Sequence, residues 1–446
     1  MVNYHLLSLG CPKNLVDSER LSAELARLGL SPAAQPEEAA VVVINTCGFI
    51  REACEESLEA ILAAAKLKEA PGRARLLVVA GCLPGRYGAE LASQLPEVDL
   101  FFGPLAEPEA AREAADKIAS MVAAAAGASP EGGCLEPPRL TPAHRAYVKI
   151  AEGCSNRCTY CTIPSIRGRR RSRPLEDIIQ EVARLSARGV REVTLVAQDS
   201  SAYGADLSPK ASLAGLLEAL RESPDGPDWL RVLYLHPARV DGRLIEALSA
   251  GGRIIPYFDL PVQHAAAPVL RAMGRGYDAS RLLRLTQRIR ERAPQAVLRA
   301  SVIVGFPGEG KREFAELLDF IVQAAFDHLG CFVFSPEEGT PAASLRPRIS
   351  RRVAEERRGL VMELQATVSQ ARNEALVGQV LPVLIEGIED GRVVGRAMRH
   401  APEIDGQVII NGVINGIIEG PAKVGEIIPV RITAASDYDL TGTPLI

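Results

Sequence analysis

The chain has 446 residues, 47% hydrophobic and 24% charged, which is enough to bury several cores in about two to four domains. Its 51 basic and 55 acidic residues give a net charge of −4, which argues against capture of nucleic acid or acidic membranes by overall charge. The composition excludes collagen-like, disordered and disulfide-scaffold proteins.

The chain carries no pattern of membrane insertion or secretion. No apolar run approaches the roughly 18 uncharged residues of a membrane helix, and the start, MVNYHLLSLGCPKN, has no basic region before its short apolar stretch. We therefore expect a cytoplasmic protein that makes no contact with a membrane. Disulfides rarely persist in that reducing compartment, so nine cysteines favour metal or redox chemistry.

Residues 1–123 alternate short apolar runs with segments of helical spacing. The expected strands are 4–9, 40–44, 76–80 and 98–102, and the expected helices are 14–28, 49–68, 86–94 and 108–123. Fully apolar strands between helices predict an α/β domain with a doubly wound parallel sheet covered on both faces. Residues 124–143, rich in Ala, Gly and Pro, are expected to be a linker.

A second alternating series runs from 144 to 375. The expected strands are 146–150, 192–196, 231–235, 257–260, 298–304 and 331–334, with helices such as 176–188, 280–292 and 309–325 between them. Six βα units with right-handed crossovers predict an open, partial (β/α)6 barrel that binds ligands at the carboxyl ends of its strands. A long polar helix is expected over 351–376.

The tail, 376–446, is rich in Val, Ile and Gly. Its short apolar runs at 380–385, 393–398 and 426–432 are typical of a small antiparallel β-barrel.

Three cysteines, Cys154, Cys158 and Cys161, follow a predicted strand with the spacing C-x3-C-x2-C, and we call them the compact triad. Three thiolates this close can surround one metal centre, but a structural zinc site needs a fourth ligand. An iron–sulfur cluster usually takes four cysteines, so three leave one iron open to bind a substrate or cofactor. The alternative, three buried core thiols, does not suit so compact a spacing in a polar loop.

Three more cysteines, Cys11, Cys47 and Cys82, each follow a predicted strand of the first domain and open a loop before a helix. We call them the upstream triad. The carboxyl ends of parallel strands meet at one edge, where ligands bind in open α/β sheets. Flanking glycines (Gly10, Gly48 and Gly81) would allow close backbone approach, and helix N-termini would favour thiolates. Three independent buried cysteines remain the alternative.

On these residues the chain resembles a known family. The C-x3-C-x2-C motif with Tyr160 before its last cysteine is the radical S-adenosylmethionine signature, and with the upstream triad the whole chain resembles the radical S-adenosylmethionine methylthiotransferases. The resemblance implies an N-terminal methylthiotransferase iron–sulfur domain (1–123), a radical core (144–375) and a C-terminal TRAM barrel (376–446). The segments SLGCPKNLVDSE, VAQDSSAYG, HAPEIDG and SDYDLTG resemble the RimO-type branch, which methylthiolates an aspartate of ribosomal small-subunit protein 12.

The resemblance also implies cofactors. One [4Fe–4S] cluster on Cys154, Cys158 and Cys161 would bind and reductively cleave S-adenosylmethionine to a 5′-deoxyadenosyl radical, with no acid–base catalytic residue beyond the cluster ligands. A second [4Fe–4S] cluster, on the upstream triad, would hold the transferred sulfur. Further expected cofactor contacts are Tyr160, Ile163, Pro164, Gln198, Asp199, Gly305 and Gly308. Glycines at strand ends are equally common as turns.

Two other groups of residues have open interpretations. His236 and His264 follow predicted strands and are expected to line the barrel mouth rather than bind a metal. The arginines near the compact triad are either a solvated surface run or a contact for substrate, ribosomal RNA or carboxylates: Arg167, Arg169, Arg170, Arg171 and Arg173.

The tail bears on the choice of substrate. Residues 376–446 contain nine acidic and five basic side chains, a net charge of −4. A barrel that grips transfer RNA should be basic, whereas an acidic one suits a basic ribosomal protein. We expect aspartate methylthiolation of protein 12, free or in the subunit, by a monomer that receives electrons from a donor such as flavodoxin or ferredoxin. The alternatives are a transfer-RNA adenosine methylthiotransferase and a non-enzymatic iron–sulfur electron carrier or sensor.

Overall fold

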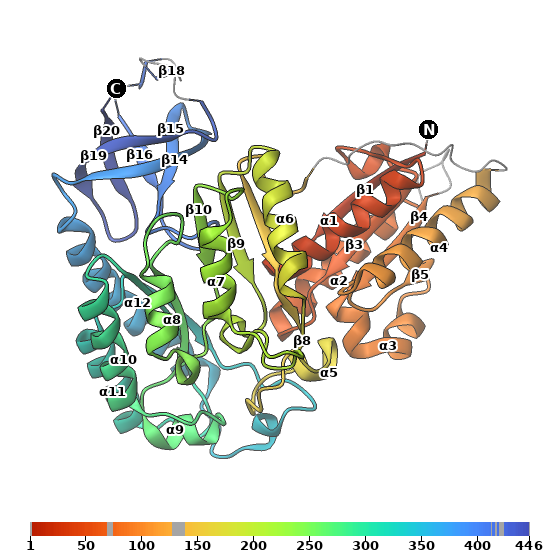
Figure 1. Ribbon diagram of the computed structural model, residues 1–446. Coiled ribbons are helices and arrows are strands. Elements are labelled where there is room, and N and C mark those ends of the chain that lie inside the picture. The colour runs from red at the N-terminus through yellow and green to blue at the C-terminus, as the bar shows by residue number, and fades with distance from the viewer. Residues whose placement is uncertain are drawn as a thin grey trace. The chain divides into compact units, whose positions relative to one another are not determined.

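The computed structural model describes residues 2–68, 75–126, 139–411, 413–414, 417–418 and 423–445 (Figure 1). The chain forms two compact units, each described by itself: unit 1 (Met1–Pro142, Ala151–Arg171 and Glu337–Thr340) and unit 2 (Ala143–Ile150, Ser172–Pro336 and Pro341–Ile446). The loop with Cys154 therefore belongs to the unit that contains the N-terminal sheet. Most of the predicted linker, 127–138 with Cys134, lies outside the described residues. The predicted domain bounds stay predictions.

Unit 1 is built on a parallel sheet of five strands in the order β2-β1-β3-β4-β5. The strands are β1 (Asn3–Ser8), β2 (Ser31–Pro32), β3 (Val41–Thr46), β4 (Leu76–Gly81) and β5 (Leu100–Phe101). The order of the strands reverses between β1 and β3, and such a switch point opens a ligand crevice at the carboxyl ends. The predicted parallel sheet is confirmed.

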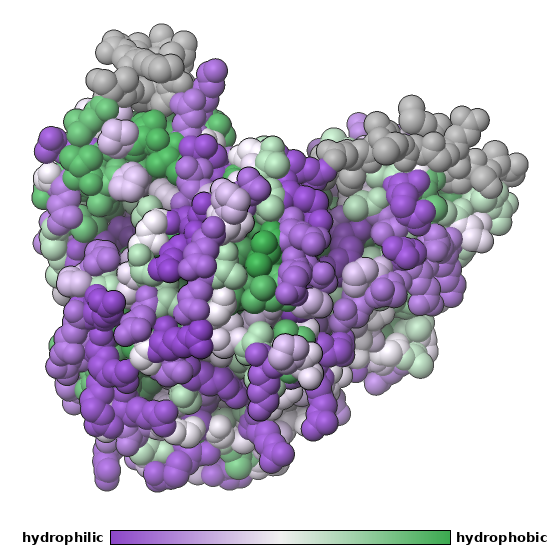
Figure 2. All heavy atoms as spheres, viewed as in Figure 1, coloured by the Kyte–Doolittle hydropathy of each residue, from purple (hydrophilic) through white to green (hydrophobic). Residues whose placement is uncertain are grey.

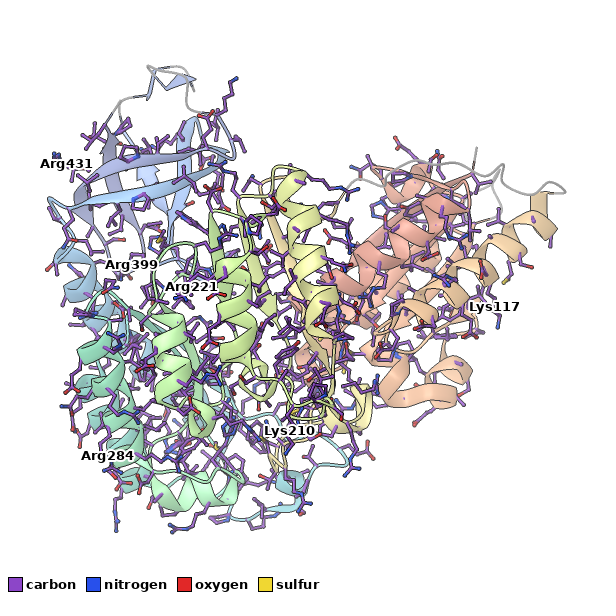
Figure 3. The ribbon with its side chains drawn as sticks, viewed as in Figure 1. Lys117, Lys210, Arg221, Arg284, Arg399 and Arg431 are labelled. Atoms are coloured by element: carbon purple, nitrogen blue, oxygen red, sulfur yellow. The ribbon has the colours of Figure 1, made fainter. Side chains whose placement is uncertain are left out.

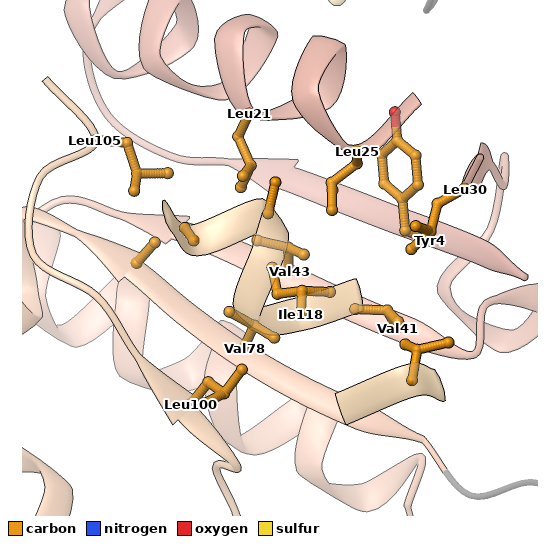
Figure 4. Packing of buried hydrophobic residues seen from close by; sticks show 14 residues of the cluster. Tyr4, Leu21, Leu25, Leu30, Val41, Val43, Val78, Leu100, Leu105 and Ile118 are labelled. Carbon is orange, nitrogen blue, oxygen red and sulfur yellow. The ribbon is translucent and has the colours of Figure 1, made fainter. Parts of the chain in front are cut away.

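Helices cover both faces of this sheet: α1 (Pro12–Arg27), α2 (Arg51–Lys66), α3 (Cys82–Gln94) and α4 (Pro108–Ala126). Alternate residues of β3 point to opposite faces, as a strand period of two requires. Val41 and Val43 pack with Leu21 and Ile118 of α1 and α4 (Figure 4), whereas Val42 and Ile44 pack toward α2 and α3. Every residue of β3 is therefore buried, which explains its unbroken apolar run.

The helix predicted at 86–94 begins earlier, because α3 opens at Cys82, directly after the strand residue Gly81. Gly81 has φ +100° and turns the chain from strand into helix within one residue. The helix is then broken at Gly88, whose backbone is not helical. The loop expected after β4 is therefore absent, and Cys82 lies in the first turn of a helix.

Unit 2 contains six parallel strands in chain order. They are β6 (Arg145–Lys149), β9 (Glu192–Val196), β10 (Trp229–Val232), β11 (Tyr257–Gln263), β12 (Val297–Val304) and β13 (His328–Val333). The strands pair within two sheets, β6-β9-β10 and β11-β12-β13, and Leu230 of β10 forms an isolated parallel bridge with Ile254, which lies before β11. Among the described residues no pairing connects β6 with β13, so the predicted open barrel is confirmed.

Three barrel strands, β10, β11 and β13, differ from their predicted bounds by three residues at one end, and β11 extends to Gln263 and not only to residue 260. β10 ends at Val232 and not at residue 235, since Tyr234 has φ +65° and interrupts the extended backbone. β13 begins at His328, three residues before the predicted start. His328 is polar but buried, and its Nε2 lies 3.0 Å from the carbonyl oxygen of Arg399.

Helices surround the strands of unit 2 and lead to the tail (Figure 1). They are α6 (Leu175–Ala187), α7 (Leu213–Glu222), α8 (Gly242–Leu248), α9 (Ala267–Ala272), α10 (Ala279–Arg292), α11 (Lys311–Ala324) and α12 (Arg351–Glu374). α12 packs on β13 and also contacts β19 of the tail. Over the described residues, no helix combines the length and apolar character that crossing a membrane requires.

The tail folds into a closed barrel of five strands in the order β14-β15-β16-β20-β19. The strands are β14 (Val380–Glu389), β15 (Arg392–Ala397), β16 (Val408–Ile410), β19 (Ile427–Ala435) and β20 (Leu440–Pro444). The predicted small β-barrel is confirmed, and it is antiparallel except for one pair, because β16 and β20 pair in parallel. A closed ring with an odd number of strands cannot alternate direction throughout, so at least one pair must be parallel.

Candidate functional site

Cys11, Cys47 and Cys82 lie at the carboxyl edge of the sheet in unit 1. Cys11 is the N-cap of α1, three residues beyond the end of β1. Cys47 directly follows β3, and Cys82 is the first residue of α3 after β4. β1, β3 and β4 are adjacent and parallel, so their carboxyl ends lie side by side.

Glycines bring these three segments into contact. A Cβ atom on Gly10 would lie 2.7 Å from Cβ and 3.0 Å from Sγ of Cys47, and one on Gly48 would lie 2.8 Å from the carbonyl carbon of Cys82. Contacts that close are not tolerated, so the Cys11 segment packs on Cys47 and the Cys47 segment packs on Cys82 only because both glycines lack a side chain. The structure thus brings the three segments of the upstream triad together.

Buried amide and hydroxyl side chains hold the three segments in place. Asn14 Nδ2 donates to the carbonyl oxygens of Leu9 (2.9 Å) and Thr46 (2.8 Å), which ties the end of β1 to the end of β3. Thr46 Oγ1 donates to the carbonyl of Ala80 (2.6 Å), and Ser57 Oγ donates to the carbonyl of Cys47 (2.9 Å). Buried polar groups are tolerated when they are satisfied in this way, and they fix one arrangement of the loops.

The three thiols differ in acidity. Burial disfavours the thiolate of Cys11, but Lys13, Arg167 and the backbone N–H groups of Asn14 and Lys13 outweigh it and lower its pKa. Burial raises the pKa of Cys47 to about 12. Burial also raises the pKa of Cys82, although the positive charge of Arg167 opposes it. A metal centre bound here must therefore displace protons from Cys47 and Cys82.

The compact triad is also part of unit 1. The Cys154 N–H donates to the carbonyl of Gly168 (3.0 Å), and a Cβ on Gly153 would collide with that same carbonyl. Cys154 is buried, whereas Cys158 and Cys161 are partly exposed. The loop is thereby folded back on the segment that follows it.

Helix α5 (Ile163–Arg167) follows this loop and anchors it. Ile163 is buried and Pro164 is exposed, and Thr162 Oγ1 donates to the carbonyl of Phe49 (3.1 Å), close to Cys47. Tyr160 is partly exposed. The roles of Tyr160, Ile163 and Pro164 as cofactor contacts stay predictions.

Arg167 is not a surface residue, and its assignment to a solvated or substrate-binding basic run is wrong. Its side chain is 1% exposed, and its guanidinium bonds Asp17 Oδ2 (3.1 Å) and Glu152 Oε1 (2.9 Å). Its Nε donates to Cys82 Sγ at 3.4 Å. Of the other arginines in the run, Arg171 is exposed and pairs with Glu107 (2.8 Å).

Both donor sets consist of thiols, the ligands that iron–sulfur clusters take. Within the described part of the chain, no group of three or more His, Cys, Asp or Glu side chains is arranged to hold one metal ion. In a cluster each thiolate binds a different iron atom, so three ligands need not converge on one point. None of the eight described cysteines is part of a disulfide.

Gln198 and Asp199 lie in unit 2, just beyond the end of β9. Asp199 is buried and engaged by the chain itself: its Oδ2 accepts from Arg239 Nη1 (2.7 Å) and its Oδ1 from Ser201 Oγ (2.5 Å). Its position at a carboxyl end agrees with the prediction, but the contact with a cofactor remains a prediction.

Gly305 and Gly308 follow β12, and a buried carboxylate organises the turn between them. Glu309 Oε2 accepts from the N–H of Gly305 (2.7 Å) and of Phe306 (3.3 Å), while Oε1 accepts from Arg357 Nη1 (2.7 Å). A Cβ on Gly305 would collide with Ala354 of α12, so this glycine has a packing role. Glu309 was not singled out from the sequence, although it directly follows Gly308.

His264 is fully buried and does not line an open mouth. Its Nδ1 accepts from the N–H of Ala266 (3.0 Å), and its Nε2 lies 3.7 Å from Glu309 Oε2. Burial and the charge of Arg357 lower the pKa of His264 to about 3. Burial and Arg275 likewise lower the pKa of His236 to about 4. Both rings are neutral at neutral pH.

The buried His264 makes the free energy of unfolding fall more steeply as the pH is lowered. The unfolded state protonates this ring near pH 6.5, whereas the folded state does so only near pH 3, so its contribution to stability is complete above pH 6.5 and is lost as the pH falls toward 3. The expected slope is about 1.4 kcal/mol per pH unit. In His264→Gln the free energy of unfolding should fall less between pH 7 and pH 5.5, as denaturant titrations would measure. Equal pH slopes in both proteins would contradict the assignment.

Family models match three parts of the chain. The Uncharacterized protein family UPF0004 matches residues 3–103, the Radical SAM superfamily matches 148–321, and the TRAM domain matches 377–445. Among solved structures, the radical S-adenosylmethionine methyltransferase TsrM from Kitasatospora setae is similar in fold, with a TM-score of 0.54 and 15% identity over 77% of this chain and 74% of that one.

Relatives match nearly the whole chain. A protein of Desulfosudis oleivorans named ribosomal protein uS12 methylthiotransferase RimO is 46% identical over 98% of this chain and 99% of its own length. Proteins of the same name from Syntrophus aciditrophicus and Geobacter sulfurreducens are 44% and 43% identical over 98% of this chain and 97% of theirs. This identity, together with the radical SAM match, shows that the chain belongs to the RimO family of ribosomal protein uS12 methylthiotransferases, which are radical SAM enzymes.

Proposed function

We propose that this protein methylthiolates the β-carbon of an aspartate on ribosomal protein uS12. The observation that carries the proposal is that both cysteine triads lie in one compact unit. The chain that contains them is 46% identical to a RimO protein over 98% of its length. Two sets of three thiols suit two [4Fe–4S] clusters, each with one iron left free. An electron carrier has no evident use for two open sites in a chain that also contains a (β/α)6 barrel.

Each group of candidate residues has its own expected role. Cys154, Cys158 and Cys161 would hold the cluster that supplies the electron for cleaving S-adenosylmethionine. Cys11, Cys47 and Cys82 would hold the one that carries the sulfur. In unit 2, Gln198, Asp199, Gly305 and Gly308 lie at carboxyl ends of barrel strands, where they would position S-adenosylmethionine and exclude water.

The surface of the tail barrel bears on the substrate. Some of its charges are used inside unit 2: Arg396 bonds Glu386 (2.8 Å), and Glu403 bonds Arg145 (2.9 Å). Arg431 lies on the barrel, whereas Arg399 lies at its junction with the core of unit 2 (Figure 3). The exposed charged residues of the described tail are Glu389, Asp390, Glu403, Glu426, Arg392, Lys423 and Arg431.

Four exposed acids against three bases make this surface nearly neutral, so the net charge of −4 overstates its acidity. Glu419 lies outside the described residues. Exposed apolar side chains such as Val380 (43%) and Ile388 (55%) also contribute to the barrel, on which Figure 2 shows hydrophobic atoms. The described surface has no basic excess of the kind that phosphate binding needs, which favours a protein substrate over transfer RNA.

The remaining partners are predictions. A cytoplasmic location follows from a ribosomal substrate and from cysteines that must stay reduced. An electron donor such as flavodoxin or ferredoxin would supply the reaction, and we expect a monomer.

Presenting both substrates in parallel tests the proposal. Anaerobically reconstituted, reduced protein with S-adenosylmethionine should add a methylthio group to an aspartate of uS12 and leave transfer RNA unchanged, as mass spectrometry would measure. A methylthio group found only on RNA would place the enzyme in the transfer-RNA branch. If neither uS12 nor transfer RNA were modified and no 5′-deoxyadenosine were formed, the result would favour the alternative that the protein is an electron carrier.

A further inference from the structure

Arg167 lies between the two cysteine triads. Its Nε donates to Cys82 Sγ (3.4 Å), and its other nitrogens are all held by carboxylate or amide oxygens of Asp17, Glu152 and Asn14. All these side chains belong to unit 1 and are buried. A guanidinium with this many fixed partners has no freedom to turn away from the thiol.

The same side chain is tied to the compact triad. Glu152 Oε1 accepts from Arg167 Nη1 (2.9 Å) and also from the N–H of Gly153 (3.1 Å), the residue before Cys154. On the other side, the Cys154 N–H donates to the carbonyl of Gly168, the residue after Arg167. Hydrogen bonds, together with the peptide links Gly153–Cys154 and Arg167–Gly168, therefore connect Cys82 of one triad to Cys154 of the other.

The charge of this network matters for any cluster on the upstream triad. The single positive charge of Arg167 faces the negative charges of two carboxylates, Asp17 and Glu152, in addition to any charge on the thiolates. Hydrogen bonds to ligand sulfur, local net charge and solvent exposure set the reduction potential of iron–sulfur clusters. An N–H donor to Cys82 stabilises negative charge on sulfur and so favours the reduced cluster, while Asp17 opposes it.

We propose that Arg167 is a positioning residue that fixes Cys82 as a cluster ligand and raises the reduction potential of the cluster on Cys11, Cys47 and Cys82. The proposal rests on the proposed function in one respect, since it requires that this triad holds a cluster. Lysine cannot replace the arginine, because one ammonium group lacks the planar fork that reaches Cys82, Asp17 and Glu152 at once.

The test isolates the upstream cluster in the full-length protein. Cys154, Cys158 and Cys161 are replaced by Ala, the protein is reconstituted anaerobically, and the midpoint potential is measured by a redox titration followed by electron paramagnetic resonance. In this background, Arg167→Lys should shift the midpoint to a more negative potential. Asp17→Asn, which keeps the bond to Cys82 and removes a negative charge, should shift it to a more positive potential.

A charge-balanced variant separates the hydrogen bond from the charge. Asp17→Asn combined with Arg167→Gln leaves the net charge unchanged, and its midpoint should still be more negative than that of the background. Arg231→Lys is the matched control, because Arg231 is a buried arginine paired with Glu192 (2.8 Å) and belongs to unit 2. Its midpoint should equal that of the background.

The outcomes separate the two proposals. Iron retained by Arg167→Lys and by the double variant, with midpoints equal to the background, would overturn the role of Arg167 and leave the cluster intact. A background protein that binds no iron would overturn both. Loss of iron in the Arg167 variants, with thermal unfolding like that of Arg231→Lys, would support the role of Arg167 in holding Cys82.

Discussion

Cys154→Ala is expected to reduce the formation of 5′-deoxyadenosine to background, whereas Cys47→Ala should keep part of it and lose only the methylthiolated product. The two thiols belong to different triads, at the loop before α5 and after β3. If each triad holds its own cluster, removal of one ligand disables that cluster alone. Anaerobic assays of both products, with iron counted for each variant, would measure the difference.

Cys331→Ala provides the control for loss of a buried thiol. Cys331 is a buried residue of β13 outside both triads, so its replacement should cost on the order of 1 kcal/mol of stability and leave both products unchanged. If Cys47→Ala formed no 5′-deoxyadenosine although it retained the cluster on Cys154, Cys158 and Cys161, the division of labour between the triads would be wrong.

Apolar periodicity was sufficient to predict most of the fold, because burial acts directly on residue type. The run VVVI at 41–44 is apolar since both faces of β3 are covered by helices. The prediction failed where polar residues are buried by distant partners, as at the start of β13, where His328 contacts the carbonyl of Arg399. It also failed for the pairing of β16 with β20, which barrel closure decides and local sequence does not.

The cysteines could be found from the sequence because their spacing and their positions after strands are local features. The hydrogen-bond partner of Cys82, Arg167, could not be found in this way, because it is 85 residues away and lies among four other arginines. A weaker pattern was present in SLGCPKNLVDSE. Asn14 and Asp17 follow Cys11 at steps of three, which places polar side chains on the buried face of α1, where a core helix would carry apolar ones.

Gly10→Ala is expected to destabilise the fold and to empty the upstream cysteine site. Gly10 has φ +88°, and a Cβ there would lie 2.7 Å from Cβ of Cys47. The backbone strain should cost about 1–2 kcal/mol and the overpacking about 1–3 kcal/mol more. Because the added methyl group pushes Cys47 away from the Cys11 segment, iron bound per protein should fall, as chemical unfolding and iron analysis of the reconstituted protein would show.

Gly189→Ala separates the strain from the clash. Gly189 has φ +87°, nearly the same backbone conformation, but a Cβ there would meet no atom within 4 Å. This variant should lose only the roughly 1–2 kcal/mol of backbone strain and bind as much iron as the wild type. If Gly10→Ala and Gly189→Ala lost equal stability and retained equal iron, the close packing of the Cys11 and Cys47 segments would not be what forms the site. A loss of iron confined to Gly10→Ala would instead show that the missing side chain of this glycine is required for the cysteines to meet.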